Sequence, residues 1–268
     1  MPGVGSGESS PPAGALCRLF AAVFLAAGLG GAACVPEGPA TSGGGAPEQV
    51  KTAAPVAQPP KPKGDSGGPP ARPPITAPFE DTFDRAELGP DWYALSPAWK
   101  ITAGRLCVRG ARNKGLWLAR KLPVNARIEL DAFAEAADGD LKVEAWGDGV
   151  SGATGTSYSN ATSYLLILGG WKNSKHVLAR LDEHGEDRLE IDVEPGADDE
   201  RARPVEVGQP YRFKIEREDG KTLSFSVNGV EYFELLDPDP LAGPGHEHLG
   251  FNDWDAPVCF DNLKVTPL

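Results

Sequence analysis

The first 78 residues of this 268-residue chain contain no Trp and no Tyr, and their two Phe residues, Phe20 and Phe24, lie in one apolar run. All six Trp and all five Tyr come after residue 90. A folded core needs large apolar side chains to offset the conformational entropy that is lost when the chain is ordered. The sequence therefore predicts no core in residues 1–78 and a single domain in residues 79–268.

Positive charge is also scarce in the expected domain. Of the 38 acidic and 26 basic residues in the chain, 4 and 5 lie before residue 79, which leaves 34 and 21 in the domain and a formal charge near −13. Such a surface repels phosphate backbones, and no basic stripe interrupts it. This balance argues against nucleic acid as a partner. The H-E-x-x-H pattern of zinc peptidases is absent as well.

The long hydrophobic run of a spanning helix is missing, but a shorter one is present. Arg18 precedes the apolar run 19–27 (LFAAVFLAA), and small residues continue to Ala33. This layout is typical of a signal peptide. The residues before Cys34 resemble the lipobox of bacterial lipoproteins, which implies a signal peptide over 1–34, lipidation of Cys34 and an anchor in the cell envelope or outer membrane. Plain secretion is the alternative.

The segment that follows, residues 35–78, is rich in Pro, Gly and Ala, with Pro-Pro pairs at 59–60, 69–70 and 73–74. This composition favours extended polyproline II over a packed structure. At about 3.1 Å per residue, such a segment reaches on the order of 100 Å. We expect a disordered tether that holds the domain away from a membrane.

Alternation of apolar and polar residues dominates the chain after residue 79. It is clearest in 126–133 (ARIELDAF), 211–216 (YRFKIE) and 223–227 (LSFSV). A period of two predicts strands with one face in a core and one face in water. No amphipathic helix of ten or more residues stands out, so we expect an all-β fold, a sandwich or jelly roll.

Turn residues mark where the strands end. Asp219-Gly220 and Asn228-Gly229 both suit tight hairpin turns, so 211–236 predicts a three-stranded meander. Further strands are expected at 79–84, 98–101, 104–109, 115–120, 141–147, 162–169, 174–180, 187–193 and 258–265.

Three stretches within residues 79–268 look familiar. They are 79–85 (FEDTFDR), 208–216 (GQPYRFKIE) and 260–265 (FDNLKV). In order and spacing they resemble concanavalin A-like lectin and glucanase jelly rolls, in particular the LamG-like and 3-keto-disaccharide hydrolase domain branches. This resemblance implies a jelly-roll β-sandwich over nearly all of the domain. The superfamily includes lectins, hydrolases and adhesion modules, so the fold does not define the function.

The same resemblance bears on cysteines and metals. Early and final strands lie side by side in these jelly rolls, which implies a disulfide between Cys107 and Cys259, with two free thiols as the alternative. Related domains hold a structural Ca²⁺ between the first and last strands. Asp81 and Asp261 are the matching carboxylates, and solvated turn carboxylates are the alternative. No other cofactor is expected.

One segment resembles a catalytic motif. Residues 190–194 (EIDVE) match the E-x-D-x-E pattern of laminarinase-type retaining glycosidases, in which Glu190 would be the nucleophile, Glu194 the acid/base, and Asp192 the residue that tunes them. However, Pro195 follows at once, and the neighbouring residues are unusually acidic. Charged edge strands have the same appearance because they resist aggregation. We favour the edge strand over catalysis.

Binding is the preferred hypothesis for the domain. Trp146 and Trp171 lie beside glycines and polar residues, and Tyr158 and Tyr164 flank a polar loop, so these four are candidate sugar platforms. Core packing is at least as good an explanation for each. Trp99 and Trp117 are assigned to the core.

Three hypotheses for the function remain. The first is a lipoprotein that displays a non-catalytic carbohydrate-binding module, whose partner is a glycan or polysaccharide. The second is an adhesion or structural envelope module with a protein partner. The third is a glycoside hydrolase of the laminarinase-like or keto-disaccharide type.

Overall fold

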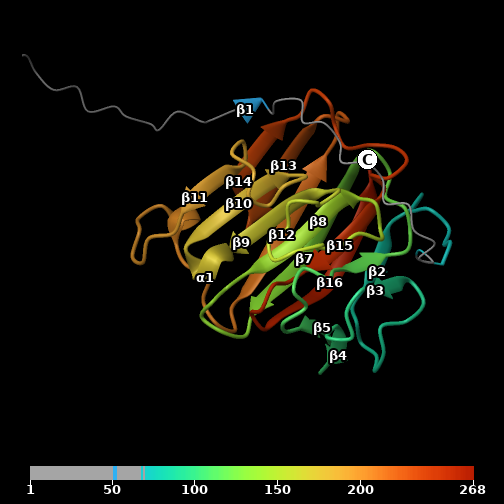
Figure 1. Cartoon of the computed structure of the whole chain (residues 1–268), viewed down its shortest axis with the longest axis horizontal. Coiled ribbons are helices and arrows are strands. Elements are labelled where there is room, and N and C mark those ends of the chain that lie inside the picture. Colours follow the sequence, from blue (N-terminus) through green and yellow to red (C-terminus); the bar gives the residue numbers. More distant parts are fainter. Residues whose placement is uncertain (1–50, 53–67, 69) are drawn as a thin grey trace, which may run out of the picture. The chain divides into compact units, whose positions relative to one another are not determined.

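The computed structural model describes residues 51–52, 68 and 70–268 (Figure 1). Cys34, the expected signal peptide and most of the expected tether lie outside the described residues. No helix in the described part of the chain is long and apolar enough to cross a membrane.

Sheet A contains nine strands within the described residues, in the order β1-β14-β13-β12-β7-β16-β5-β4, and β2 also pairs with β16. Only β1 pairs in parallel, with β14. The bounds are β1 (Lys51–Thr52), β2 (Phe79–Asp81), β4 (Lys100–Thr102), β5 (Arg105–Val108), β7 (Ala126–Ala134), β12 (Pro210–Arg217), β13 (Thr222–Val227), β14 (Val230–Leu236) and β16 (Val258–Pro267).

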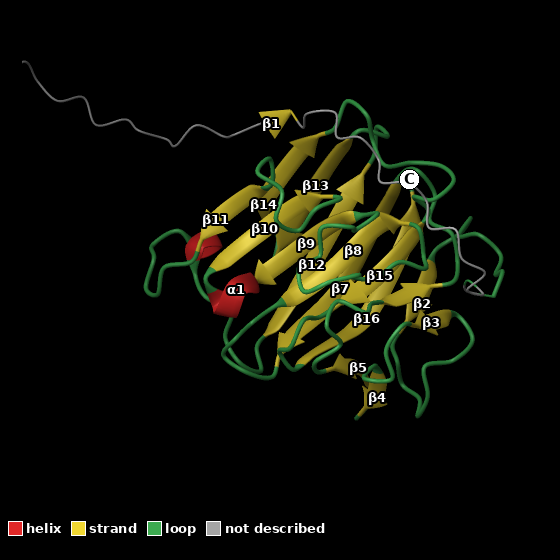
Figure 2. Cartoon of the chain, viewed as in Figure 1, coloured by secondary structure: helices red, strands yellow, loops and turns green. Residues whose placement is uncertain are grey.

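Over the described part of the chain, sheet B contains seven strands, in the order β11-β10-β9-β8-β15-β6-β3, and all these pairs are antiparallel. The bounds are β3 (Trp92–Ala94), β6 (Leu116–Leu118), β8 (Leu141–Gly147), β9 (Tyr164–Gly169), β10 (Lys175–Arg180), β11 (Leu189–Asp192) and β15 (His248–Asn252). Two short helical turns complete the described chain, α1 (Gly170–Asn173) and the 3₁₀ turn η1 (Glu200–Ala202) (Figure 2).

The two sheets share one core. On β7 the side chains alternate as the sequence predicts, with Ile128 and Leu130 buried. They belong to one apolar cluster with Phe213 and Phe225 of sheet A and with residues of sheet B such as Leu166. Inner faces from both sheets therefore pack against each other, which confirms the all-β jelly-roll sandwich.

The predicted meander is also confirmed. Strands β12, β13 and β14 are successive antiparallel neighbours. The turn between β13 and β14 places Asn228 at φ 53° and Gly229 at φ 86°. These are left-handed conformations, as the Asn-Gly dipeptide indicates.

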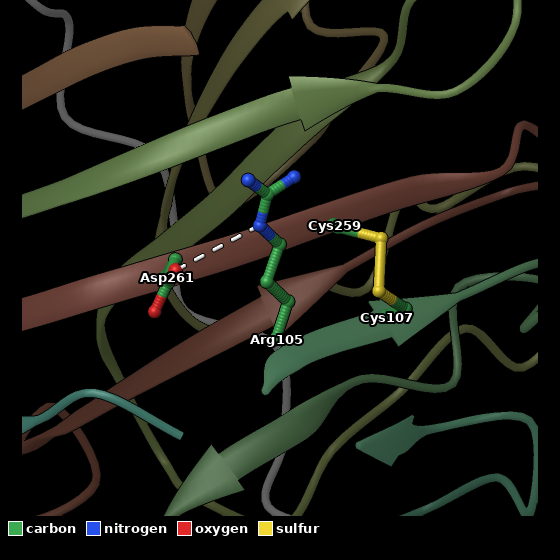
Figure 3. Close-up of a disulfide and its surroundings, with 4 residues drawn as sticks. All are labelled: Arg105, Cys107, Cys259 and Asp261. Carbon is green, nitrogen blue, oxygen red and sulfur yellow. Dashed lines mark ion pairs between the residues drawn. A yellow bond between two sulfur atoms is a disulfide. The ribbon is translucent and has the colours of Figure 1, made fainter. Parts of the chain in front are cut away.

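The disulfide between Cys107 and Cys259 is confirmed, and it joins β5 to β16 (Figure 3). The two residues are direct partners in the antiparallel register, with a Cα–Cα distance of 4.1 Å. The bridge links residues 152 positions apart, so it ties the start of the domain to its last strand.

Two features differ from the sequence predictions. The domain begins before residue 79, because Ile75 is buried in the core and its N–H donates to the Lys121 carbonyl. Strands β3 and β15 were also not predicted; for β15, a segment with two polar ends and a central Gly250 is not typical of a strand. The glycine is required by packing, because a Cβ there would lie 2.7 Å from Cε3 of Trp117.

Candidate functional site

The face of sheet B that points away from sheet A, here called the outer face, is largely covered by the loop 148–163. Tyr158 of this loop packs on Leu165, Ile167 and Val177 of the sheet, together with other small apolar residues. The loop continues over Trp117, whose indole N–H donates to the Ser151 carbonyl at 2.9 Å. The outer face is therefore not an open concave surface along its whole length.

A cleft of about 660 Å³ remains beside this cover. Connections at one end of the strands contribute most of its lining, and the loops 148–163 and 181–188 reach it from the other end. The side chains and backbone that line it belong to Arg109, Asn113, Glu135, Ala136, Asp138, Asp140, Lys142, Thr156, Ser157, Trp171, Lys172, Glu183, His184, Trp254, Asp255, Ala256 and Pro257. Its volume lies in the range of small-molecule sites.

Lys142 forms the floor of the cleft. Its side chain is 1 % exposed, and its Nζ lies 2.6 Å from Glu183 Oε1 and 3.9 Å from Asp140 Oδ1. It also donates to Asn113 Oδ1 at 3.0 Å. Burial alone would lower the pKa of Lys142, but Asp140 and Glu183 raise it above its ordinary value. The buried ammonium thus joins three separate loops.

Two half-buried tryptophans, Trp171 and Trp254, line the cleft. The Arg188 guanidinium lies 4.6 Å from the ring centre of Trp171, and the Arg112 guanidinium lies 4.8 Å from that of Trp254. The backbone N–H of Trp254 donates to Asp140 Oδ2 at 3.3 Å. Each ring is thus held by contacts outside the cleft while part of it faces the cleft.

A second polar cluster lies under the loop 148–163, around Glu144 of β8. The hydroxyls of Tyr158 and Ser163 donate to its carboxylate at 3.0 Å and 2.6 Å, and the Asn252 amide also donates to it. The side chain is fully buried, and this burial raises the pKa of Glu144 to about 7, in spite of its hydrogen bonds. Glu144 does not line the cleft and is part of the support beneath the loop.

Of the four candidate sugar platforms, only Trp171 lines the cleft; Trp146, Tyr158 and Tyr164 are fully buried. Tyr158 is part of the cover itself. Trp146 has a φ of 55° at a β-bulge between β8 and β15, and the bulge turns its ring into the shared core. Tyr164 lies in the same core and donates from its hydroxyl to Asp237 at 2.6 Å. These three residues offer no exposed face to a ligand.

The glycosidase-like segment begins on β11, one of the two edge strands of sheet B. Glu190 and Asp192 both accept from the Lys175 ammonium, at 2.6 Å and 2.7 Å, and the strand ends before Glu194. Burial raises the pKa of Glu190, but hydrogen bonds from Lys175 and Arg188 outweigh it and hold that pKa below its ordinary value. Glu190, Asp192 and Glu194 do not line the cleft.

The two carboxylates expected to bind calcium make separate interactions. Asp81 accepts from the Arg85 guanidinium at 2.5 Å and 2.8 Å, from the Trp92 indole at 2.8 Å and from the Phe83 N–H at 2.9 Å. Asp261 lies 3.8 Å from the Arg105 guanidinium (Figure 3). No group of three or more His, Cys, Asp or Glu residues suited to a metal occurs among the described residues. The arrangement around Asp81 does not fit a cation, since donors already surround its oxygens.

The residues of the cleft floor were hard to predict from the sequence. In the segment 141–145 (LKVEA), Lys142 and Glu144 alternate with apolar residues, which is typical of a strand with one solvated face. Both side chains are instead buried, because loops fold over that face. The Gly/Ser/Thr-rich composition of 148–163 was the only signal of this cover, and it does not state where the loop lies.

Replacement of Lys142 tests whether its buried ion pair stabilises the floor of the cleft. We expect Lys142→Met to lower the free energy of unfolding by about 3–5 kcal/mol, because it leaves the buried carboxylate of Glu183 without its partner. Lys175→Met is the matched control, since Lys175 pairs with two carboxylates at the exposed edge and should cost about 0–1 kcal/mol. Urea denaturation measures both. Equal losses in the two variants would contradict the assigned role of Lys142.

The raised pKa of Glu144 predicts that the free energy of unfolding depends on pH. The folded-state pKa of Glu144, about 7, lies above the ordinary value of 4.5, so its contribution to stability is fully present below pH 4.5 and is lost as the pH rises through 7. Between pH 5 and pH 8 this loss is about 2–3 kcal/mol. Glu144→Gln cannot ionise, so we expect it to lose correspondingly less stability over this range in urea denaturation. An unchanged pH slope would show that Glu144 ionises freely.

Comparisons with known proteins give matches in fold only. No protein-family model and no curated protein sequence matches the chain. Similar solved structures include a β-1,3-1,4-glucanase (lichenase) from a mouse hindgut metagenome, with 11% identity and a TM-score of 0.48, which covers 72% of this chain and 100% of the glucanase.

Two further matches are binding or uncharacterised proteins. The carbohydrate recognition domain of Emp46p has 12% identity and a TM-score of 0.46, covering 66% of this chain and 88% of that domain. A Bacillus subtilis protein of unknown function with a galectin-like fold has 15% identity and a TM-score of 0.45, covering 70% and 94%. At such identities nothing about ligand or activity transfers to this chain. The two packed sheets themselves confirm the fold that the sequence resemblance implied, a jelly-roll β-sandwich.

Proposed function

We propose that the domain is a non-catalytic carbohydrate-binding module and that the cleft beside the loop 148–163 takes the glycan. The observation that carries this proposal is the pair of half-buried tryptophans, Trp171 and Trp254, in one cleft with many hydrogen-bonding groups. Flat aromatic rings pack on the C–H surfaces of sugars, while polar groups recognise their hydroxyls.

The charges around the cleft favour a neutral glycan. In the floor, Lys142 lies between Glu183 and Asp140, which leaves one net negative charge, and Asp255 pairs with Arg112 at 3.0 Å. The remaining charged side chains of the lining, Arg109, Lys172, Glu135 and Asp138, are exposed and form no ion pair with any described residue, so two of each sign face the solvent. The whole domain carries a formal charge near −13, which disfavours anionic polymers.

We further propose that the protein is exported and anchored by a lipid on Cys34. This part rests on the sequence of the first 34 residues, in which a short apolar run leads to small residues and then Cys34. Attached acyl chains would hold the protein firmly at a membrane. The Pro/Gly-rich residues 35–78 would then give the domain its reach toward polysaccharide.

Affinity electrophoresis tests the ligand. We expect the purified chain to be retarded in native gels that contain a neutral polymer, such as mixed-linkage β-glucan, laminarin or mannan, but not in gels with alginate or polygalacturonate. Trp254→Ala should abolish the retardation because it removes one of the two rings in the cleft. Tyr93→Ala, which removes a half-buried aromatic residue outside the cleft lining, should leave it unchanged.

The other outcomes are equally informative. A cleared zone in a gel stained for intact polymer would replace the binding module with a hydrolase. Unchanged migration in every gel would contradict a polysaccharide ligand and direct attention to a protein partner.

Substitution of the lipidation cysteine tests the anchor. We expect the wild-type chain to sediment with membranes and Cys34→Ser to move to the soluble exported fraction, because the acyl chains attach through that sulfur. Cys107→Ser/Cys259→Ser is the matched control, since it removes two cysteines but leaves Cys34 in place. A wild-type chain that is soluble without membrane attachment would support plain secretion instead.

A further inference from the structure

The connection between β9 and β10 has an unusual backbone. Trp171, Lys172 and Asn173 follow one another in left-handed conformations, at φ 50°, 59° and 61°. Such conformations are unfavourable for residues with a Cβ, and runs of them are rare because each residue adds to the cost. Asn tolerates the conformation, but Trp and Lys have no special adaptation to it.

The turn is held in this conformation by the side chain of Asn173. Its Oδ1 accepts from the Val205 N–H at 2.9 Å, and its Nδ2 donates to the carbonyls of Val205 at 2.8 Å and Ala137 at 3.1 Å. One amide group thus connects the turn to two other segments. Close approach adds to the constraint, since a Cβ at Gly169 would lie 2.7 Å from both Asn173 Oδ1 and Val205 Cγ2.

The residue that this turn presents is Trp171. Its ring packs on the apolar cluster of the outer face, has the Arg188 guanidinium 4.6 Å from its centre, and meets the His184 ring edge-on at 5.7 Å. The ring also lines the cleft. Backbone and side chain are therefore both fixed before any ligand arrives, and a pre-organised ring loses little entropy on binding. Strained backbone that surrounding contacts over-determine is common at ligand sites.

We propose that the left-handed turn 171–173 holds Trp171 rigidly in place as a ligand platform, and that Asn173 is the positioning residue of this turn. We call this turn the mount of Trp171. This inference rests on the proposed glycan-binding function of the cleft. Asn173 itself acts through the backbone it holds, because its polar atoms are engaged by Val205 and Ala137.

Asn173→Gly is the primary test, because glycine accepts the left-handed conformation but removes the three side-chain hydrogen bonds. Asn228→Gly is the matched control. Asn228 is also left-handed, its Oδ1 accepts from the Arg212 N–H at 2.8 Å, and it lies in a hairpin outside the cleft lining. The probe is the neutral polymer that retards the full-length wild-type chain most strongly.

We expect Asn173→Gly to weaken retention by about tenfold and Asn228→Gly to leave it within about twofold. A second readout is the indole N–H signal of Trp171 in NMR spectra, assigned by its loss in Trp171→Ala. This signal should shift or broaden in Asn173→Gly and stay unchanged in Asn228→Gly. Unchanged affinity in Asn173→Gly would overturn the proposed mount.

A second pair of variants covers the case in which Asn173→Gly fails to fold. Lys172 is exposed, and its side chain forms no hydrogen bond or ion pair within the part of the chain that the structure describes. Lys172→Gly therefore changes mainly the backbone, and Lys172→Ala controls for the lost side chain. We expect the glycine variant to have an equal or higher Tm, by up to about 2–4 °C, and several-fold weaker retention than the alanine variant. Equal retention in the two variants would overturn the inference.

The experiments distinguish a missing role of the turn 171–173 from a missing glycan-binding function of the cleft. If the wild type is retarded and Trp254→Ala is not, while Asn173→Gly binds normally, the cleft binds glycan but the mount has no role. If the wild type is not retarded by any polymer, the glycan-binding function fails, and the inference about Trp171 fails with it.

Discussion

The cleft depends on one buried ammonium group. Lys142 belongs to β8, whereas Asn113, Asp140 and Glu183 come from three different loops, and all three direct oxygen atoms to Nζ. A buried charge without partners is costly, so each of these loops is fixed relative to the sheet by the need to satisfy it. Asp140 also accepts a hydrogen bond from the backbone N–H of Trp254, which links that residue to the floor of the cleft. The position of one tryptophan thus follows from the electrostatics of the floor.

The outer face of sheet B is divided between cover and cleft. The loop 148–163 lays Tyr158 on the apolar part of the sheet and closes over Glu144, whose carboxylate accepts from Tyr158 and Ser163. What stays open is the neighbouring region, where connections from the strand ends meet. A recognition site in a β-sandwich is commonly built on such loops, because the sheets supply rigidity and the loops supply variety.

The tryptophans show how backbone conformation decides the role of an aromatic residue. Trp146 and Trp171 have similar surroundings in the sequence, with glycine and polar neighbours, and both have positive φ angles. At Trp146 the irregularity is a bulge that sends the ring into the core. At Trp171 it is a left-handed turn that keeps the ring at the cleft. Composition alone does not separate these outcomes.

The sequence by itself determined the strand-rich domain, the 211–236 meander with its Asn228-Gly229 turn, and the charged edge strand at 189–192, because period-two alternation and turn propensity are local properties. Its resemblance to known jelly rolls implied the Cys107–Cys259 bridge. Only the tertiary structure decided that Lys142 is buried and that Trp171 meets Trp254 in one cleft. Those outcomes depend on where loops distant in sequence come to lie, and an alternating pattern does not say whether the polar face meets water or another segment of the chain.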